Sequence, residues 1–356
     1  MVGKSHTKRR HENQSIYQLK YVDDSTVDFN LFNSSIAFKN LKFSTKATSS
    51  REMQMKRLSI ITVLFLTIAV FIGCSQSDHK ATPGAFEIPV PTAPGISVES
   101  NEIAKIDYSN NQDGYVIVVF TGSTESALRV VVTAPHDAQY IYALNSGGVL
   151  EVIPLTEGDG EYTIGIYENV EADNYTSVLS LTIDVVLQNR FNPFIRPNQF
   201  VNYSKDSELV SLAAELTKDA ENVKDMIIAI YDYIIDNFTY DYNLAQTVQS
   251  GYLPDLDEVL HRKEGICFDY SALVTAMLRS QGIPTRLEIG YHGEEYHAWI
   301  SLFCEENGWI DKRYHYDYNE EEWTAMDPTF ESGEHHEHTS RQQARDDLEY
   351  RLMFNY

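Results

Sequence analysis

The segment GICFDYSALVTAMLRSQG, residues 265–282, places a lone cysteine at the expected start of a helix. Apolar residues recur at helical spacing after Cys267, which predicts an amphipathic helix over 266–281 that ends at Gly282. The residues expected on its buried side are Leu273, Ala276 and Met277. A cysteine in the first helical turn meets unpaired N–H groups and the positive end of the helix dipole, which favour a thiolate. Cys267 is therefore either a small buried residue or a nucleophile.

Two later strands carry residues that could activate such a nucleophile. In YHAWISLF, strand alternation puts His297 on the opposite face from Ala298 and Ile300. In EEWTAMDPTF, Asp327 ends the next predicted strand, where Pro328 stops the pairing. Neighbouring antiparallel strands can bring a histidine and an aspartate side by side. The three residues would then form a cysteine, base and orienting carboxylate.

The order and local context of these motifs resemble the transglutaminase-like superfamily. The similar region runs over about 205–330, and it includes EGICFDYSALVTAMLRSQGIPTRLEIGY, HAWISLF and WTAMDPTF. The resemblance implies a papain-like core with helices packed on an antiparallel sheet. It also implies Cys267 as nucleophile, His297 as general base and Asp327 as the orienting carboxylate. It says nothing of the region before residue 189.

One departure from the family pattern leaves an alternative for the third residue. Asp327 follows His297 by thirty residues, which is longer than the usual family spacing. The additional segment contains Trp309 and Asp311, so Asp311 competes for the role of orienting carboxylate. Asp327 is favoured because it precedes Pro328 and Thr329 in the D-P-T sequence typical of the family. The segment 304–322 is then expected to form an additional hairpin beside the site.

The remaining site predictions concern an oxyanion donor and a metal. The backbone N–H of Cys267 could stabilise a developing oxyanion, with Tyr240 or Tyr242 of FTYDYN as a side-chain donor. The sequence EHHEH at 334–338 could bind a metal, but a solvated loop is the favoured reading. Cys304 is expected to be a strand residue. No cofactor and no metal site are predicted.

The periodicity of the chain predicts two domains of different class. Over 96–188, six or more short alternating strands separated by turn residues predict an all-β, immunoglobulin-like sandwich, a spacer or binding module. The segment Asn189–Pro197 is the predicted linker. Over 189–356, helices are expected at about 206–217, 221–237 and 255–261. Antiparallel strands follow, so this domain is predicted to be α+β.

The N-terminal region contains a membrane-targeting signal that begins late. Residues 55–74 combine Lys56 and Arg57, an apolar run and Cys74, as in a bacterial lipoprotein signal peptide whose cysteine receives the lipid. A cleaved secretory signal and an uncleaved anchor are the alternatives. The polar residues 1–54 are then either disordered, as a misassigned extension, or a genuine cytoplasmic tail. Residues 75–95 form a Pro-rich tether.

Charge and location narrow the expected partners. A net charge of −24 argues against binding to a nucleic-acid backbone. We expect an extracytoplasmic protein, anchored to the bacterial cell membrane through a lipid on Cys74, that acts on peptides or proteins, cell-wall peptides among them. The leading prediction is a cysteine hydrolase for peptide or isopeptide bonds. A protein-glutamine transglutaminase and a non-catalytic surface binding module are the alternatives.

Overall fold

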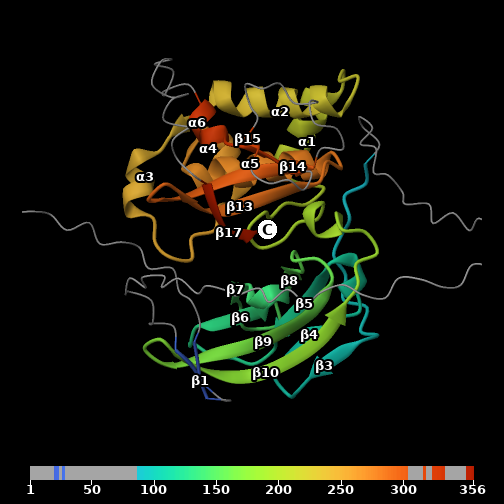
Figure 1. Ribbon diagram of the computed structural model, residues 1–356, viewed down its shortest axis with the longest axis vertical. Coiled ribbons are helices and arrows are strands. Elements are labelled where there is room, and N and C mark those ends of the chain that lie inside the picture. The colour runs from blue at the N-terminus through green and yellow to red at the C-terminus, as the bar shows by residue number, and fades with distance from the viewer. Residues whose placement is uncertain (1–19, 24–25, 29–85, 304–315, 318–322, 333–349) are drawn as a thin grey trace, which may run out of the picture.

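The computed structural model describes residues 20–23, 26–28, 86–303, 316–317, 323–332 and 350–356. Figure 1 shows two parts: the N-terminal part consists mainly of β-strands, and in the C-terminal part helices cover a sheet. The predicted signal at 55–74, Cys74, Cys304, Asp311 and the sequence at 334–338 lie outside the described residues. Within these residues, no helix is long and apolar enough to cross a membrane.

Two antiparallel sheets form the N-terminal part. The strands are β1 (Lys20–Asp23), β2 (Thr26–Asp28), β3 (Val98–Ser100), β4 (Ala104–Asp107), β5 (Tyr115–Phe120), β6 (Leu128–Thr133), β7 (Gln139–Leu144), β8 (Leu150–Pro154), β9 (Gly160–Glu171) and β10 (Asn174–Val185). One sheet has the order β1-β2-β10-β9-β6-β7 and the other β3-β4-β5-β8. Alternate residues such as Ile164 in β9 and Val118 in β5 enter one buried cluster, because strand side chains alternate between faces. The predicted sandwich of strands is therefore present, and its likeness to immunoglobulin domains stays a prediction.

The segment predicted as a linker is packed rather than extended. Its short 3-10 helix, Asn192–Phe194, is buried throughout. Arg279 donates from Nη1 to the Arg196 carbonyl at 2.8 Å, and Arg196 donates from Nη1 to the Asn192 carbonyl at 3.0 Å. Because these backbone groups are satisfied by side chains, the connection between the two parts has a defined conformation.

The helices of the described residues are α1 (Glu208–Thr217), α2 (Val223–Asn237), α3 (Tyr242–Thr247), α4 (Leu256–Arg262), α5 (Cys267–Ser280) and α6 (Pro328–Glu331). The four helices that the periodicity indicates are present as α1, α2, α4 and α5, and the short helices α3 and α6 were not predicted. The prediction of an amphipathic α5 is wrong, since every residue from Asp269 to Ser280 is buried. The reason is that α5 packs against α1, α2 and α4 as well as against β13 and β14. A helix enclosed on all sides has no polar face to present to water.

A five-stranded sheet positions the C-terminal motifs. Its strands are β13 (Thr285–His292), β14 (Glu295–Phe303), β15 (Tyr316–Asp317), β16 (Trp323–Met326) and β17 (Tyr350–Asn355), in the order β15-β16-β14-β13-β17. A separate parallel pair joins β11 (Thr239–Tyr240) to β12 (Glu264–Gly265). Since β16 pairs with β14, the end of β16 lies beside the strand that carries His297.

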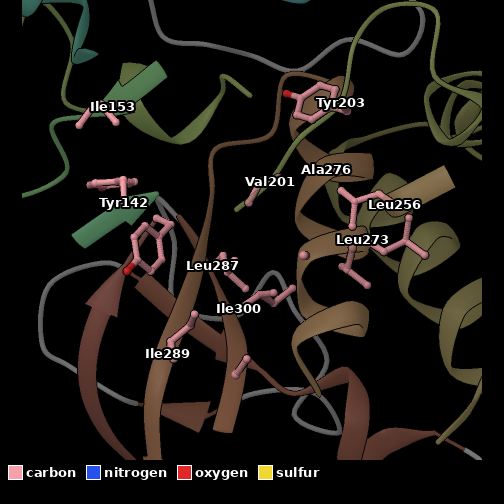
Figure 2. Packing of buried hydrophobic residues seen from close by; sticks show 14 of the residues in the cluster. Tyr142, Ile153, Val201, Tyr203, Leu256, Leu273, Ala276, Leu287, Ile289 and Ile300 are labelled. Carbon is pink, nitrogen blue, oxygen red and sulfur yellow. The ribbon is translucent and has the colours of Figure 1, made fainter. Parts of the chain in front are cut away.

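The two parts share one hydrophobic core (Figure 2). Tyr142 and Ile153 of the sandwich belong to the same buried cluster as Leu273 of α5 and Leu287 of β13. Tyr356 links them, because its ring stacks on Phe200 with centroids 3.9 Å apart and meets Tyr142 edge-on at 6.0 Å. The sandwich is therefore fixed against the α+β part.

Candidate active site

Cys267 is the first residue of α5, as the sequence predicts. The chain before it approaches the helix so closely that a Cβ on Gly265 would lie 2.6 Å from that of Asp269. This approach lets Asp269 Oδ2 accept the backbone N–H of Ile266 at 2.8 Å, while Asp269 Oδ1 accepts the Tyr252 hydroxyl at 2.7 Å. Asp269 thus stabilises the N-terminus of α5. Cys267 itself is a free cysteine and is half-buried.

His297 and Asp327 meet in the interior beside Cys267. The distance from His297 Nε2 to Asp327 Oδ2 is 2.6 Å, and both side chains are buried. The imidazole also makes a side-chain hydrogen bond with Cys267. Because Nε2 faces the carboxylate, Nδ1 is the ring nitrogen left for the sulfur. The structure therefore brings together the three residues predicted to form a triad.

Asp327 is held by donors other than His297. It is the N-cap of α6, and its Oδ1 accepts the backbone N–H of Thr329 at 3.0 Å and of Phe330 at 3.2 Å. Its Oδ2 accepts the Tyr350 hydroxyl at 2.8 Å. A buried carboxylate with this many donors is strongly stabilised in its charged form.

The charges of the site shift the pKa values of His297 and Asp327 in opposite directions. Burial alone would lower the pKa of His297, but the negative charges of Asp327 and Cys267 and their hydrogen bonds raise it well above its ordinary value. Burial alone would raise the pKa of Asp327, but the charge of His297 and the hydrogen bonds from His297, Tyr350 and Phe330 lower it. The site therefore favours a protonated His297 beside a charged Asp327.

Aromatic rings fix the plane of the His297 imidazole. Phe330 of α6 stacks on it with centroids 5.0 Å apart and an interplanar angle of 29°. Trp299, two residues along β14, lies nearly parallel to it at 6.3 Å. Trp299 is held in turn, since its Nε1 donates to the buried Glu288 Oε2 at 2.6 Å. These contacts restrict rotation of the imidazole ring. The restricted orientation lets one ring nitrogen face the sulfur while the other faces the carboxylate.

The two tyrosines predicted as oxyanion donors occupy different places. Tyr240 is partly buried, and burial raises its pKa above the ordinary value. Tyr242 is half exposed and packs edge-on against Tyr240 at 5.0 Å. The backbone holds Tyr240 in place, because β11 pairs with β12 just before Cys267. Of the two, Tyr240 is the tyrosine whose backbone pairs with the chain that leads into Cys267.

Two residues near the site have no counterpart among the predicted site residues. Tyr350 donates to Asp327 from β17. Tyr296 is exposed beside His297, and burial and the charges of Tyr291 and Cys267 raise its pKa. Tyr296 directly precedes His297 in β14, whereas Tyr350 was not predictable from local sequence, because only strand pairing brings it to Asp327. In the described part of the chain, no group of three His, Cys, Asp or Glu side chains could hold a metal ion.

Comparison with known proteins agrees with this geometry. Residues 210–312 match the model of the transglutaminase-like superfamily. The α+β part therefore contains a transglutaminase-like core domain. A segment of the chain is 31% identical over 120 residues to the uncharacterized protein YebA of Bacillus subtilis, covering 28% of this chain and 16% of that protein. The match thus spans less than a fifth of the relative's length.

Solved structures that resemble the chain share little sequence with it. A candidate cysteine protease from Cytophaga hutchinsonii has 16% identity and a TM-score of 0.34, over 68% of this chain and 76% of that one. The periplasmic domain of TgpA from Pseudomonas aeruginosa has 14% identity and a TM-score of 0.31, over 69% and 79%. Red sea bream transglutaminase has 12% identity and a TM-score of 0.26, over 60% and 48%. The assignment of the domain rests on the family match.

Proposed function

We propose that this protein is a cysteine hydrolase that cleaves peptide or isopeptide bonds through an acyl-enzyme on Cys267. The observation that carries the proposal is the buried contact of 2.6 Å between His297 and Asp327, with the same imidazole hydrogen-bonded to the half-exposed Cys267. A nucleophile, a base and an orienting carboxylate in this order are what acyl transfer requires.

The proposed reaction uses the residues as follows. While His297 holds the proton, the sulfur of Cys267 attacks the carbonyl carbon, so that negative charge develops on the oxygen. The N-cap Ile266 makes no side-chain capping bond within the described structure, which leaves the first N–H groups of α5 to stabilise this oxygen, with the Tyr240 hydroxyl as a second donor. His297 gives the proton to the leaving nitrogen as the C–N bond breaks.

Water then resolves the thioester. His297 takes a proton from water, the hydroxide adds to the thioester carbon, and the C–S bond breaks to release a carboxylic acid. His297 keeps the proton beside the freed sulfur of Cys267, so the cycle closes without a cofactor. Asp327 keeps its charge throughout and stabilises the imidazolium that forms in both steps. An amine in place of water would give acyl transfer instead.

Labelling and turnover assays test the proposal on the full-length protein. With iodoacetamide at neutral pH, we expect Cys267 to be alkylated much faster than a model thiol. The Cys267→Ala variant should lose this label, and Cys304→Ser should keep it. Quenched peptides and glutamine peptides with a fluorescent amine then separate the reactions. Hydrolysis without amine incorporation supports the proposal. Amine incorporation that is lost in Cys267→Ala would establish transglutaminase activity. Alkylation of Cys267 no faster than that of a model thiol would contradict catalysis and favour the non-catalytic binding module.

We also propose that the protein acts outside the cytoplasm, anchored to the membrane through a lipid on Cys74, on peptides or proteins such as cell-wall peptides. The support is the basic, apolar and cysteine order of residues 55–74. Mass spectrometry of the native protein should find a lipid-modified chain that starts at Cys74. The Cys74→Ser variant should lack the lipid. A mature chain that begins elsewhere would contradict the anchor.

A further inference from the structure

Tyr350 is the donor that connects the triad to the rest of the molecule. Its hydroxyl lies 2.8 Å from Asp327 Oδ2, the same oxygen that faces His297. Oδ1 is held separately by the backbone N–H groups of Thr329 and Phe330. The carboxylate is therefore held at both oxygens before His297 is counted. A group fixed in this way keeps its direction while the imidazole gains and loses a proton.

The strand that carries Tyr350 fits closely against β13. Tyr350 lies opposite His292, and Leu352 lies opposite Gly290, where the register shifts. A Cβ on Gly290 would lie 2.1 Å from the Arg351 carbonyl oxygen, so this approach requires glycine. The position of Tyr350 therefore depends on where β17 lies in the sheet.

The sandwich anchors the other end of β17. Glu157 accepts hydrogen bonds from the Tyr140 hydroxyl and from Asn355 Nδ2, the latter at 3.2 Å. The Asn355 backbone N–H donates to the Tyr140 hydroxyl at 3.5 Å. The Tyr140 ring meets Phe354 and Tyr356 edge-on at 5.7 and 5.6 Å. These contacts fix three consecutive residues of the segment that carries Tyr350.

We propose that Tyr350 is a positioning residue that aims Asp327 at His297, and that the sandwich sets its place by anchoring β17. The inference rests on the proposed function, since it assigns a role within that site. It also gives the sandwich a role in catalysis that is independent of any ligand. The contacts form one continuous series from Glu157 to Tyr140, along β17 to Tyr350, and then to Asp327.

The test compares the full-length protein with Tyr350→Phe, which removes the hydroxyl and keeps the ring. The measurement is the rate of Cys267 alkylation by iodoacetate as a function of pH. This reagent is an anion, so its rate falls when His297 loses its proton. The groups that face His297 are Cys267 from α5, Asp327 from the end of β16, His292 from β13 and Tyr350 from β17.

The direction of the shift distinguishes positioning from a simple change of charge. If Tyr350 positions Asp327, its loss lets the carboxylate turn away. The alkylation rate at neutral pH should then fall about tenfold. The pH above which the rate declines, called the basic limb, should decrease by about one unit, which corresponds to the free energy of one charge-assisted hydrogen bond. If the Tyr350 hydroxyl instead only offsets part of the charge of Asp327, its removal makes the carboxylate a stronger acceptor for His297. The basic limb then moves to higher pH. A limb that is unchanged or moves up would overturn the proposal.

Tyr115→Phe is the matched control. Tyr115 is also a buried tyrosine whose hydroxyl makes backbone hydrogen bonds, accepting the Thr92 N–H at 3.1 Å, but it lies in β5 of the sandwich. It should lower stability to a similar extent and leave the alkylation profile unchanged. A general loss of stability would move both variants alike, and circular dichroism confirms that each is folded.

A double-mutant cycle tests the part played by the sandwich. Tyr140→Phe removes the hydroxyl that bonds Glu157 and Asn355 and leaves Tyr350 intact. We expect it to lower the alkylation rate severalfold, and the double variant with Tyr350→Phe to be no slower than Tyr350→Phe alone. The role of the sandwich would be overturned if the two substitutions lowered the alkylation rate independently, so that their factors multiplied in the double variant. It would also be overturned if Tyr140→Phe left the rate unchanged. If the unmodified protein reacts no faster than a model thiol, the proposed function fails instead.

Discussion

Asp327 serves both the backbone and the site. Its Oδ1 begins α6 by accepting two backbone N–H groups, and its Oδ2 faces His297 and Tyr350. An asparagine can keep the first function, because its carbonyl oxygen accepts the same N–H groups. Its amide N–H₂ cannot accept from His297. The substitution therefore separates the structural contribution of Asp327 from its proposed catalytic one.

We expect Asp327→Asn to lower kcat by about 10³- to 10⁴-fold with little change in KM. The reason is that the imidazole loses the acceptor that holds it and stabilises its charge. Steady-state hydrolysis of a peptide substrate measures the loss. Asp311→Asn is the control, because Asp311 is the competing aspartate in the sequence. Equal losses in both variants, or a loss in Asp311→Asn alone, would remove Asp327 from the triad.

The pair also makes stability depend on pH. The folded pKa of Asp327 is lowered, so its contribution is present above about pH 3.9 and is lost as pH falls through the folded pKa. The folded pKa of His297 is raised, so its contribution is present below about pH 6.5 and is lost as pH rises through the folded pKa. The difference in unfolding free energy between the protein and Asp327→Asn should be largest at about pH 4–6.5, on the order of 1–3 kcal/mol. Urea unfolding measures it, and a pH-independent difference would contradict the ion pair.

Much of this site is predictable from local patterns, and part of it is not. The helix start fixes Cys267, and the strand motifs supply His297 and Asp327, because each pattern lies within a few residues. Tyr350 follows from no such pattern, since its contact with Asp327 depends on β17 pairing with β13 across some sixty residues. Long-range pairing of this kind is set by the whole sheet.

At the level of elements, helix bounds follow the sequence closely, while the environment of α5 does not. The predicted 221–237 and 266–281 become Val223–Asn237 and Cys267–Ser280. The complete burial of α5 was not predicted because it depends on how many neighbours pack around it. Arg279 illustrates this, since a charged residue suggests a solvent-facing side. It is instead buried, with Nε donating to the Thr285 carbonyl and Nη2 to the Tyr356 carbonyl.

The fit of β17 against β13 gives a prediction for Gly290. Gly290→Ala would place a methyl group 2.1 Å from the Arg351 carbonyl, so β17 must shift away from β13. We expect the variant to lose about 1–3 kcal/mol of unfolding free energy and most of the Cys267 alkylation rate. Urea unfolding and iodoacetamide labelling give the two values.

Gly165→Ala is the control for this prediction. Gly165 also lies in a strand, where a Cβ would meet the Tyr167 ring at 2.5 Å, but it belongs to the sandwich. We expect lower stability with an unchanged alkylation rate. If both glycine variants react with iodoacetamide at the rate of the unmodified protein, the place of β17 has no bearing on the site.

On the scale of the whole molecule, we expect the sandwich and the α+β part to unfold together, because they share one hydrophobic core. Tyr356 lies at the centre of that junction, between Phe200 on one side and Tyr140 and Tyr142 on the other. The sequence predicts two separate domains because its periodicity changes at the linker. It contains no pattern that reveals how far the two cores merge.

Tyr356→Ala tests this junction. Removing a buried aromatic ring should lower the unfolding free energy by about 3–5 kcal/mol. It should also divide a single calorimetric transition into two, because the two parts lose their common contact. Tyr242→Ala is the control, since Tyr242 is half exposed and away from the junction. Two transitions already present in the unmodified protein would show that the parts unfold independently.

The order of the strands along the chain has a consequence for biosynthesis. Cys267, His297 and Asp327 all leave the ribosome before β17, yet β17 carries the Tyr350 that braces Asp327. A nascent chain thus contains the reactive thiol long before its supporting strand exists. Because synthesis proceeds from the N-terminus, the site can be completed only after β17 is made and packs against the sandwich, which is already synthesised.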